Sequence, residues 1–267
     1  MKGRRVWKTE QEKKFVKVFD SFSAKHNSWK VWSDFVSIFA IALSNATELD
    51  QKVHDEREKW YLDIVKSYSN EEMTAFSELA AITTMALKHN PQQDFLGELY
   101  MGLDFGSSWH GQFFTPWNVS FMMAKMMITP GRAQKEEDGY FSVCDPTCGA
   151  GCMLIAAAAA YQGDSEAPTY QNDILFVGQD LDQVVALMCY IQLSLLGCAG
   201  YVAIGNSLSN PICGHDLCPS IGEHGSLWFT PMWSSPLWVQ RRIAYLTQHA
   251  EDQRIGESEE KKNVKTA

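Results

Sequence analysis

Apolar side chains recur at helical spacing through the first third of the chain. Phe15, Phe19 and Phe22 lie three or four positions apart, and the same spacing returns in residues 32–43 and 60–65. A stripe of apolar side chains along one side of a helix normally packs against a neighbouring helix. The pattern therefore predicts a helical bundle, with the aromatic side chains in its core.

The boundaries of this helical region are marked by capping and turn residues. Ser69-Asn-Glu-Glu72 is typical of a capping box, in which the serine caps a new helix and the glutamate reaches back. Pro91-Gln-Gln-Asp94 reads as a hinge. We predict an N-terminal helical domain over residues 1–90, a second domain over 91–250 and a charged tail over 251–267 that we expect to be disordered.

After the hinge the pattern changes to short apolar runs separated by helix-forming segments. The runs at 140–144, 173–178 and 201–204 predict strands, and 226–229 predicts a fourth. The alanine-rich segment 153–160 is a strong helix former. Alternation of this kind is typical of an α/β domain.

A helix is also expected before the first strand. Thr115 as its cap and Pro116 at its first position set its start, and Thr129-Pro-Gly-Arg132 is expected to end it. Four methionines lie along this helix. We interpret them as adaptable core rather than as a substrate surface: Met122, Met123, Met126 and Met127.

Composition narrows the class of protein. The chain has 267 residues, 45% of them hydrophobic, and a formal net charge of −9. No run of about 18 apolar residues is present, and the seven scattered cysteines are as expected of reduced thiols, so we expect a cytoplasmic protein away from the membrane. Cys213 and Cys218 near His215 invite a metal interpretation, but their spacing fits no regular zinc pattern, and we predict no metal.

The stretch from Tyr140 to Leu154 carries the clearest chemistry. An apolar run breaks at Asp145-Pro146, turns through Gly149-Ala-Gly151 and becomes the alanine-rich helix. A turn of this kind lets a ligand approach the backbone at the end of a strand, so a nucleotide-like ligand is expected. The chain contains neither GxGxxG here nor a phosphate loop, and no Lys or Arg occurs in residues 136–239. S-adenosylmethionine fits better, because it has no phosphate and Asp145 suits its cationic groups.

Five segments in order carry a resemblance to a known family. Asp145-Pro-Thr-Cys-Gly-Ala-Gly151 resembles the cofactor motif of N6-adenine DNA methyltransferases, specifically the modification subunit of type I restriction systems. Gly111-Gln-Phe-Phe-Thr-Pro116 resembles the family's GQFYTP segment, and Asp94 to Tyr100 resembles its D-x-x-G-x-x-Y element. Gly178 to Asp182 and Gly205 to Leu208 resemble the second and third cofactor motifs.

The resemblance implies a Rossmann-like S-adenosylmethionine-dependent methyltransferase fold with a helical N-terminal domain. It also implies a cofactor site, whose expected residues are Thr115, Pro116, Asp145, Pro146, Cys148, Gly149, Gly151, Asp180 and Asn206. Asp180 would accept hydrogen bonds from a ribose diol, although it and Asp182 could instead merely cap the next helix. Asn206 stands where the family usually has Asp, and its carbonyl oxygen could still accept from the adenine amino group.

Two departures from the family pattern concern catalysis and length. No [Asn/Asp/Ser]-Pro-Pro-[Tyr/Phe] turn follows the expected fourth strand, and the nearest substitute is Thr230-Pro231-Met-Trp233. Trp233 could stack on a flipped base, but Thr230 offers a hydroxyl where a carboxamide or carboxylate belongs. The chain also leaves room for about four strands, which predicts a truncated sheet whose fourth strand lies near an edge that a partner could cover.

Two functions follow as hypotheses. The first is an S-adenosylmethionine-dependent DNA adenine-N6 methyltransferase of a restriction-modification system, with Thr230, Pro231 and Trp233 as a degenerate catalytic turn. Its partners would be DNA and possible specificity or other protein subunits. The alternative is a catalytically weak or inactive cofactor-binding subunit, regulatory or anti-restriction, that works through a partner. Methylation of something other than DNA stays open.

Overall fold

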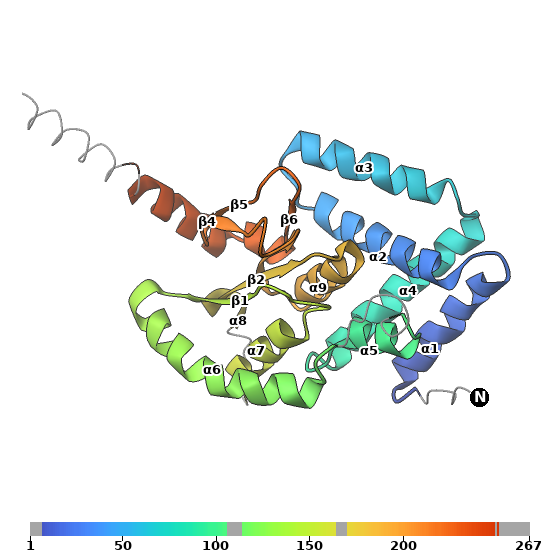
Figure 1. The fold of residues 1–267 in the computed structure, drawn as a ribbon, viewed down its shortest axis with the longest axis horizontal. Coiled ribbons are helices and arrows are strands. Elements are labelled where there is room, and N and C mark those ends of the chain that lie inside the picture. Colours follow the sequence, from blue (N-terminus) through green and yellow to red (C-terminus); the bar gives the residue numbers. More distant parts are fainter. Residues whose placement is uncertain (1–6, 106–113, 164–169, 249, 251–267) are drawn as a thin grey trace, which may run out of the picture.

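The computed structural model describes residues 7–105, 114–163, 170–248 and 250, with the backbone alone for 129–138 (Figure 1). The N-terminal part is helical, as predicted, and each of its four α-helices starts at a capping side chain. Its elements are α1 (Glu10–Phe19), the 3-10 helix η1 (Asp20–Ala24), α2 (Ser28–Asn45), α3 (Gln51–Val65) and α4 (Asn70–His89). The capping box of Ser69 and Glu72 is confirmed, and Thr9 with Glu12 forms a second one at α1.

The second part alternates helices and strands. The helices are α5 (Phe95–Gly102), α6 (Trp117–Asp138), α7 (Cys152–Gln162), α8 (Tyr170–Asp173) and α9 (Gln183–Leu195). The strands are β1 (Phe141–Asp145), β2 (Ile174–Asp180), β3 (Ala199–Ile204), β4 (Cys213–His215), β5 (Cys218–Ser220) and β6 (Ser226–Phe229). The 3-10 helix η2 (Pro231–Ser234) and a helix over residues 236–248 complete the described chain.

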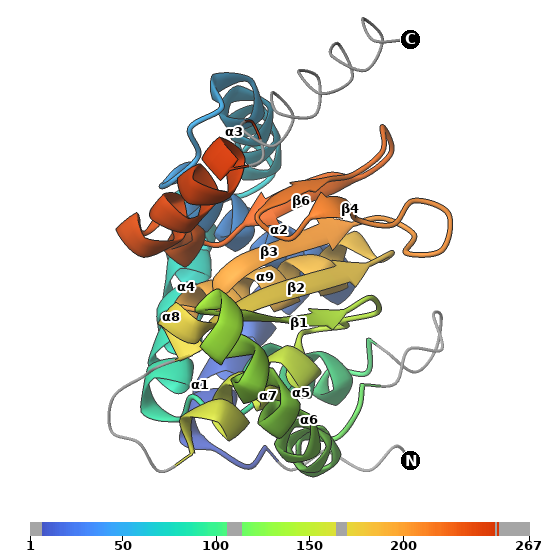
Figure 2. The same ribbon diagram turned by 90° about the vertical axis from the view of Figure 1, so that its left-hand side faces the viewer.

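The sheet is small and mixed. Its order is β1-β2-β3-β6, with β1, β2 and β3 parallel and β6 antiparallel to β3, while β4 and β5 form a separate hairpin. The predicted α/β class, truncated sheet and N-terminal helical region are confirmed. Figure 2 shows the strands in this order, with α6 and α7 next to β1.

Two hydrophobic clusters cover the faces of the sheet. The larger one joins the N-terminal aromatic residues, including Phe15 and Trp32, to α7, α9 and one face of the sheet. The smaller one lies on the other face, where Tyr201 packs near Trp233 and Trp238. The predicted core role of the N-terminal aromatic residues is confirmed. The division into two domains at residue 90 stays a prediction, since one core spans it.

The expectations about α6 were wrong in two ways. The helix does not end at Thr129–Arg132 but continues to Asp138. Pro130 removes only one helical hydrogen bond, and the following Ala, Gln, Lys and Glu residues favour helix. The four methionines are not core either: Met122, Met123, Met126 and Met127 are 41–74% exposed.

The β6 edge of the sheet is covered by α3. Arg57 is buried, and its guanidinium donates to the Leu227 carbonyl at 2.9 Å and to Glu48 at 2.8 Å. The same guanidinium lies over the Trp228 ring, 3.9 Å from its centroid. The arginine therefore satisfies an edge carbonyl that would otherwise be open to pairing.

Replacing Arg57 with alanine should destabilise the fold by about 2–4 kcal/mol, because it leaves the part-buried Leu227 carbonyl without its donor and Glu48 without its ion-pair partner. The free energy of unfolding in urea measures this. Lys59→Ala, at an exposed site of the same helix, is the control and should change it little. Equal effects of the two substitutions would contradict this role of Arg57.

Candidate functional site

The carboxyl ends of the three parallel strands meet at one edge of the sheet. Asp145 ends β1 and is paired in register with Gly178, and Asp180 ends β2 opposite Ile204. Gly205 and Asn206 follow β3 directly. The register therefore brings together the three segments that the sequence predicted to hold a cofactor.

The turn after β1 has a backbone that favours glycine. Gly149 and Gly151 have φ values of +56° and +95°, in the left-handed region. A Cβ at Gly151 would lie 2.8 Å from Cys189 Sγ, and one at Gly149 would lie 3.3 Å from the Phe114 ring. The two glycines thus allow both the turn and its close packing.

Asp180 is held beneath this turn by backbone donors. Its carboxylate accepts from the Gly149 amide at 2.9 Å and from the Asp182 amide at 3.0 Å. Asp182 in turn caps α9, accepting from the amides of Val184 and Val185. Each carboxylate oxygen of Asp180 keeps further acceptor capacity, because it can accept two hydrogen bonds. Capping by Asp182 is confirmed, and the ribose contact of Asp180 stays a prediction.

The electrostatics of this edge favour a cation. Burial raises the pKa of Asp145, the hydrogen bond from the Thr147 amide lowers it, and the charge of Asp180 raises it further. Burial also raises the pKa of Tyr100 to about 12, helped by the charges of Asp182 and Asp180. The charge of Asp180 disfavours ionisation of Asp145, so a positively charged ligand near both would stabilise their ionised forms.

A buried glutamine ties the turn to α5. Gln192, on α9, donates to Asp94 at 2.7 Å and to the Ala150 carbonyl at 2.8 Å, and its oxygen accepts from the Leu96 amide at 3.1 Å. Sequence reasoning missed this residue. Its signal was a lone carboxamide in the apolar run of α9, which must find partners when buried.

Asp94 is the other end of this bridge. Its carboxylate caps α5 by accepting from the Gly97 amide at 2.9 Å, and the side chain is buried. Burial raises the pKa of Asp94 to about 6, against the opposing hydrogen bonds from Gln192 and Gly97. The D-x-x-G element is thereby fixed next to the glycine turn.

The segment before α6 also reaches the turn. Gly111 to Phe113 lie outside the described residues, but Phe114 packs against Gly149 and stacks on Tyr100 with ring centroids 5.2 Å apart. The carbonyl of Pro116 accepts the first helical hydrogen bond of α6, from Ser120, so Pro116 and not Thr115 stands at the cap position and the predicted start was one residue early. Thr115 and Pro116 are exposed and border a cavity of about 210 Å³ beside Asp94.

The remaining predicted cofactor residues lie on the same edge. Pro146 is exposed, and Cys148 is buried beneath the turn, its amide donating to the Gln179 carbonyl at 2.9 Å. The Asn206 side chain is exposed, and its oxygen accepts from the amides of Leu208 and Ser209 at 2.9 and 3.2 Å. Their contacts with a cofactor stay predictions.

The predicted catalytic turn lies elsewhere. Because β6 is antiparallel, Phe229 pairs with Tyr201 at the start of β3, and Thr230 follows at the amino ends of the parallel strands. The Thr230 hydroxyl is buried, donates to the Cys198 carbonyl at 2.7 Å and accepts from the Gly200 amide at 3.1 Å. Pro231 begins η2, and Trp233 is buried against Tyr201. The structure therefore does not bring Thr230, Pro231 and Trp233 together with the predicted cofactor residues, and their catalytic role stays a prediction.

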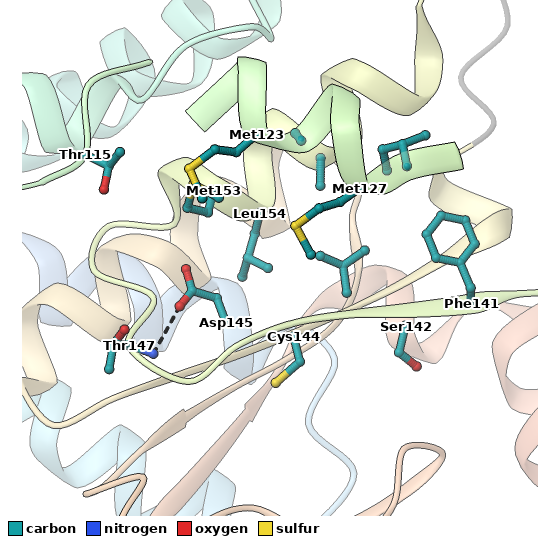
Figure 3. A pocket seen from close by; sticks show the side chains of 14 residues that line it. Thr115, Met123, Met127, Phe141, Ser142, Cys144, Asp145, Thr147, Met153 and Leu154 are labelled. Atoms are coloured by element: carbon teal, nitrogen blue, oxygen red, sulfur yellow. Dashed lines mark hydrogen bonds between the residues drawn. The ribbon is translucent and has the colours of Figure 1, made fainter. Parts of the chain in front are cut away.

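A second cavity, of about 590 Å³, is lined in part by Asp145 (Figure 3). It runs along β1 between α6 and α7, and its walls are mostly apolar. Its lining includes Thr115, Met123, Met127, Phe141, Asp145, Thr147, Met153 and Leu154.

Within the described ranges, no group of three or more His, Cys, Asp or Glu side chains is arranged to hold a metal ion. No helix in that part of the chain is long and apolar enough to cross a membrane.

Comparison with known proteins identifies the family. The model of the family described as N-6 DNA Methylase matches residues 92–251, more than half of the chain. The chain therefore belongs to the N-6 DNA methylase family, and the predicted resemblance is confirmed. Membership of this family supports the prediction that the chain is a methyltransferase. Comparison with curated proteins gives no match.

One solved structure is similar at low identity. It is that of a putative class I S-adenosylmethionine-dependent methyltransferase from Listeria monocytogenes, with 14% identity and a TM-score of 0.39. The alignment covers 88% of this chain and 70% of the other.

Adding a methyl group at Gly151 should destabilise the turn. Gly151→Ala places an L residue in the left-handed region and pushes Cβ against Cys189, which together should cost about 2–4 kcal/mol. Gly139→Ala is the matched control, because φ is +75° there and the nearest atom is 3.8 Å away. It should cost only about 1–2 kcal/mol. The same loss in both variants, measured by urea unfolding, would contradict a steric role for Gly151.

Asp94 should give stability a distinct pH dependence. Its pKa is raised to about 6 from 3.8, so the folded state binds the proton more tightly and this contribution is lost as pH rises through 6. The difference is about 2.4 kcal/mol between pH 4 and pH 7. In Asp94→Asn the amide oxygen keeps both acceptor roles without titrating. The free energy of unfolding of wild type minus that of the variant should fall by this amount over the window, and a constant difference would contradict the assignment.

Proposed function

We propose that this chain binds S-adenosylmethionine over the carboxyl ends of β1, β2 and β3. The observation that carries the proposal is the pair of carboxylates, Asp145 and Asp180, beside a glycine turn with no Lys or Arg in residues 136–239. A phosphate-bearing ligand would find repulsion there, whereas a sulfonium and an ammonium would find compensation. The residues present therefore fit this cofactor.

Each of the predicted cofactor residues below would have its own role in holding S-adenosylmethionine. Asp145 would attract the cationic end, and Asp180, fixed by the amides of Gly149 and Asp182, would accept from the ribose hydroxyls. Gly149 and Gly151 let the ligand approach the backbone, and Asn206 would accept from the adenine amino group. When bound, the cofactor would supply an electrophilic methyl group.

The substrate we propose is the adenine N6 amine of DNA, as the family match supports. The net charge of −9 is unfavourable for a chain that grips phosphates alone. We therefore infer that DNA contact is local or shared with a second subunit, as in a restriction-modification complex. Recognition of a particular DNA sequence would then belong to the partner.

A second function is favoured by the position of the Thr230 turn. Its hydroxyl is committed to Cys198 and Gly200, away from the cofactor residues. The isolated chain would then bind the cofactor but transfer its methyl group slowly or not at all. It would act as a regulatory or anti-restriction subunit that works through a partner.

Isothermal titration with S-adenosylmethionine tests the cofactor site. Wild type should bind in the micromolar range, and Asp145→Ala and Asp180→Ala should weaken binding about 10-fold or more, since each removes a charge-assisted contact. Asp63→Ala, an exposed carboxylate on α3, is the control and should bind like wild type. Thermal unfolding without ligand checks that each variant is folded. No binding by folded wild type would overturn the proposal.

Methyl transfer then separates the two functions. Labelled methyl incorporation into adenine-containing DNA by the purified chain, lost in Asp145→Ala, supports the enzyme. Cofactor binding without incorporation supports the subunit that works through a partner.

A further inference from the structure

Gln179 is a polar side chain at the end of a buried apolar run on β2. The run from Ile174 to Gln179 is buried, and every residue in it before Gln179 is apolar or glycine. Gln179 itself is 3% exposed. A buried carboxamide destabilises a fold unless its N–H groups and its oxygen find partners. The proposed cofactor site uses the next residue, Asp180, but gives Gln179 no role.

The carboxamide of Gln179 bonds to the backbone of the segment that follows β3. Its Nε2 donates to the Gly205 carbonyl at 3.2 Å and to the Asn210 carbonyl at 2.8 Å. Its Oε1 accepts from the Ile212 amide at 3.2 Å. One side chain therefore holds both ends of segment 205–212 and a point between them.

The other hydrogen bonds of this segment shape it without fixing its far side to the sheet. The Asn206 carbonyl accepts from the Asn210 amide at 2.7 Å, and the Asn206 side chain accepts from two further amides of the same turn. The Gly205 amide donates to the backbone of β2 at 2.9 Å, which attaches the start of the segment. Gln179 attaches the start and also the part beyond the turn.

Gln179 and Asp180 serve different loops because neighbouring residues of a strand point to opposite faces of a sheet. Gln179 is on the face of Leu175 and Val177, which belong to the smaller hydrophobic cluster, and Ile212 packs against that cluster. Asp180 is on the other face, where its carboxylate accepts from an amide of the glycine turn. Two successive side chains of β2 thus fix two loops at the carboxyl ends of the strands.

Any effect of Gln179 on a ligand must pass through the segment that it holds. Gln179 is buried, and its carboxamide is already bonded to backbone groups, so it has no surface to offer a ligand. Asn206 is the second residue of the segment and is exposed. A shift of the segment would displace Asn206 even if the hydrogen bonds within its own turn stayed intact.

We propose that Gln179 is a positioning residue for the adenine end of S-adenosylmethionine, which acts by holding segment 205–212, and with it Asn206, at the end of β3. This inference rests on the proposed function, in which Asn206 contacts the adenine. The cationic end of the ligand belongs to Asp145, on a different strand. Its contact does not depend on Gln179.

Hydrogen exchange of the free chain tests the holding role without any ligand. Gln179→Met keeps an unbranched side chain of similar length but removes the three hydrogen bonds, so exchange in 205–212 should become about 10-fold faster or more. The backbone carbonyl of Gln179 still accepts from the Cys148 amide, so exchange in 147–152 should stay unchanged. Gln240→Met, at an exposed glutamine, is the matched control. Unchanged exchange in 205–212 overturns the proposal.

Isothermal titration with S-adenosylmethionine tests whether the effect passes through Asn206. Gln179→Met should weaken binding about 10-fold in wild type and again in Asp145→Ala, but less than about 2-fold in Asn206→Ala, where the contact to be misplaced is already gone. Thermal unfolding checks that each variant is folded.

The outcomes separate this role from the proposed function. A general defect of the fold would weaken binding by the same factor in all three backgrounds, and that result overturns the role of Gln179 alone. No binding by folded wild type overturns the cofactor site, and the role of Gln179 in it falls too.

Discussion

The buried carboxamide of Gln192 is the contact on which the site depends. It lies on α9 and bonds at once to Asp94, to the Leu96 amide and to the Ala150 carbonyl. Three segments far apart in the sequence are thereby held together: the start of α5, the glycine turn and the helix after β2. A buried amide of this kind is stabilising only when its donors and acceptor are paired, so the network tolerates little change. In the same turn, the Gly149 amide donates to the Asp180 carboxylate.

The carboxylates at this edge of the sheet explain how an acidic chain could hold its ligand. Asp145 and Asp180 lie at the ends of neighbouring strands, where burial and mutual repulsion raise the pKa of Asp145. Residues 136–239, which include the three parallel strands and the glycine turn, contain no Lys or Arg. A ligand with positive charge would therefore complete the site. Family membership supports the class of ligand, and the electrostatics are an independent reason for it.

Much of the fold could be predicted because local patterns determine it. The capping box at Ser69, the cap at Asp182 and the strand-turn-helix around Asp145 follow from short-range chemistry. The antiparallel direction of β6 could not be predicted, because alternation of apolar and polar residues has no polarity. The sequence therefore could not show that the Thr230 turn lies at the amino ends of the parallel strands. The exposure of the α6 methionines also escaped prediction, since a stripe looks the same whether or not its partner is in the chain.

Hydrogen exchange with and without S-adenosylmethionine tests the central claim most directly. The account places the cofactor at the carboxyl ends of β1 to β3, with the Thr230 turn at the far end of the sheet. It predicts that the ligand slows exchange in 147–152, 178–182 and 204–206 and leaves 229–234 unchanged. Slowed exchange in 229–234, without change in the glycine turn, would contradict it.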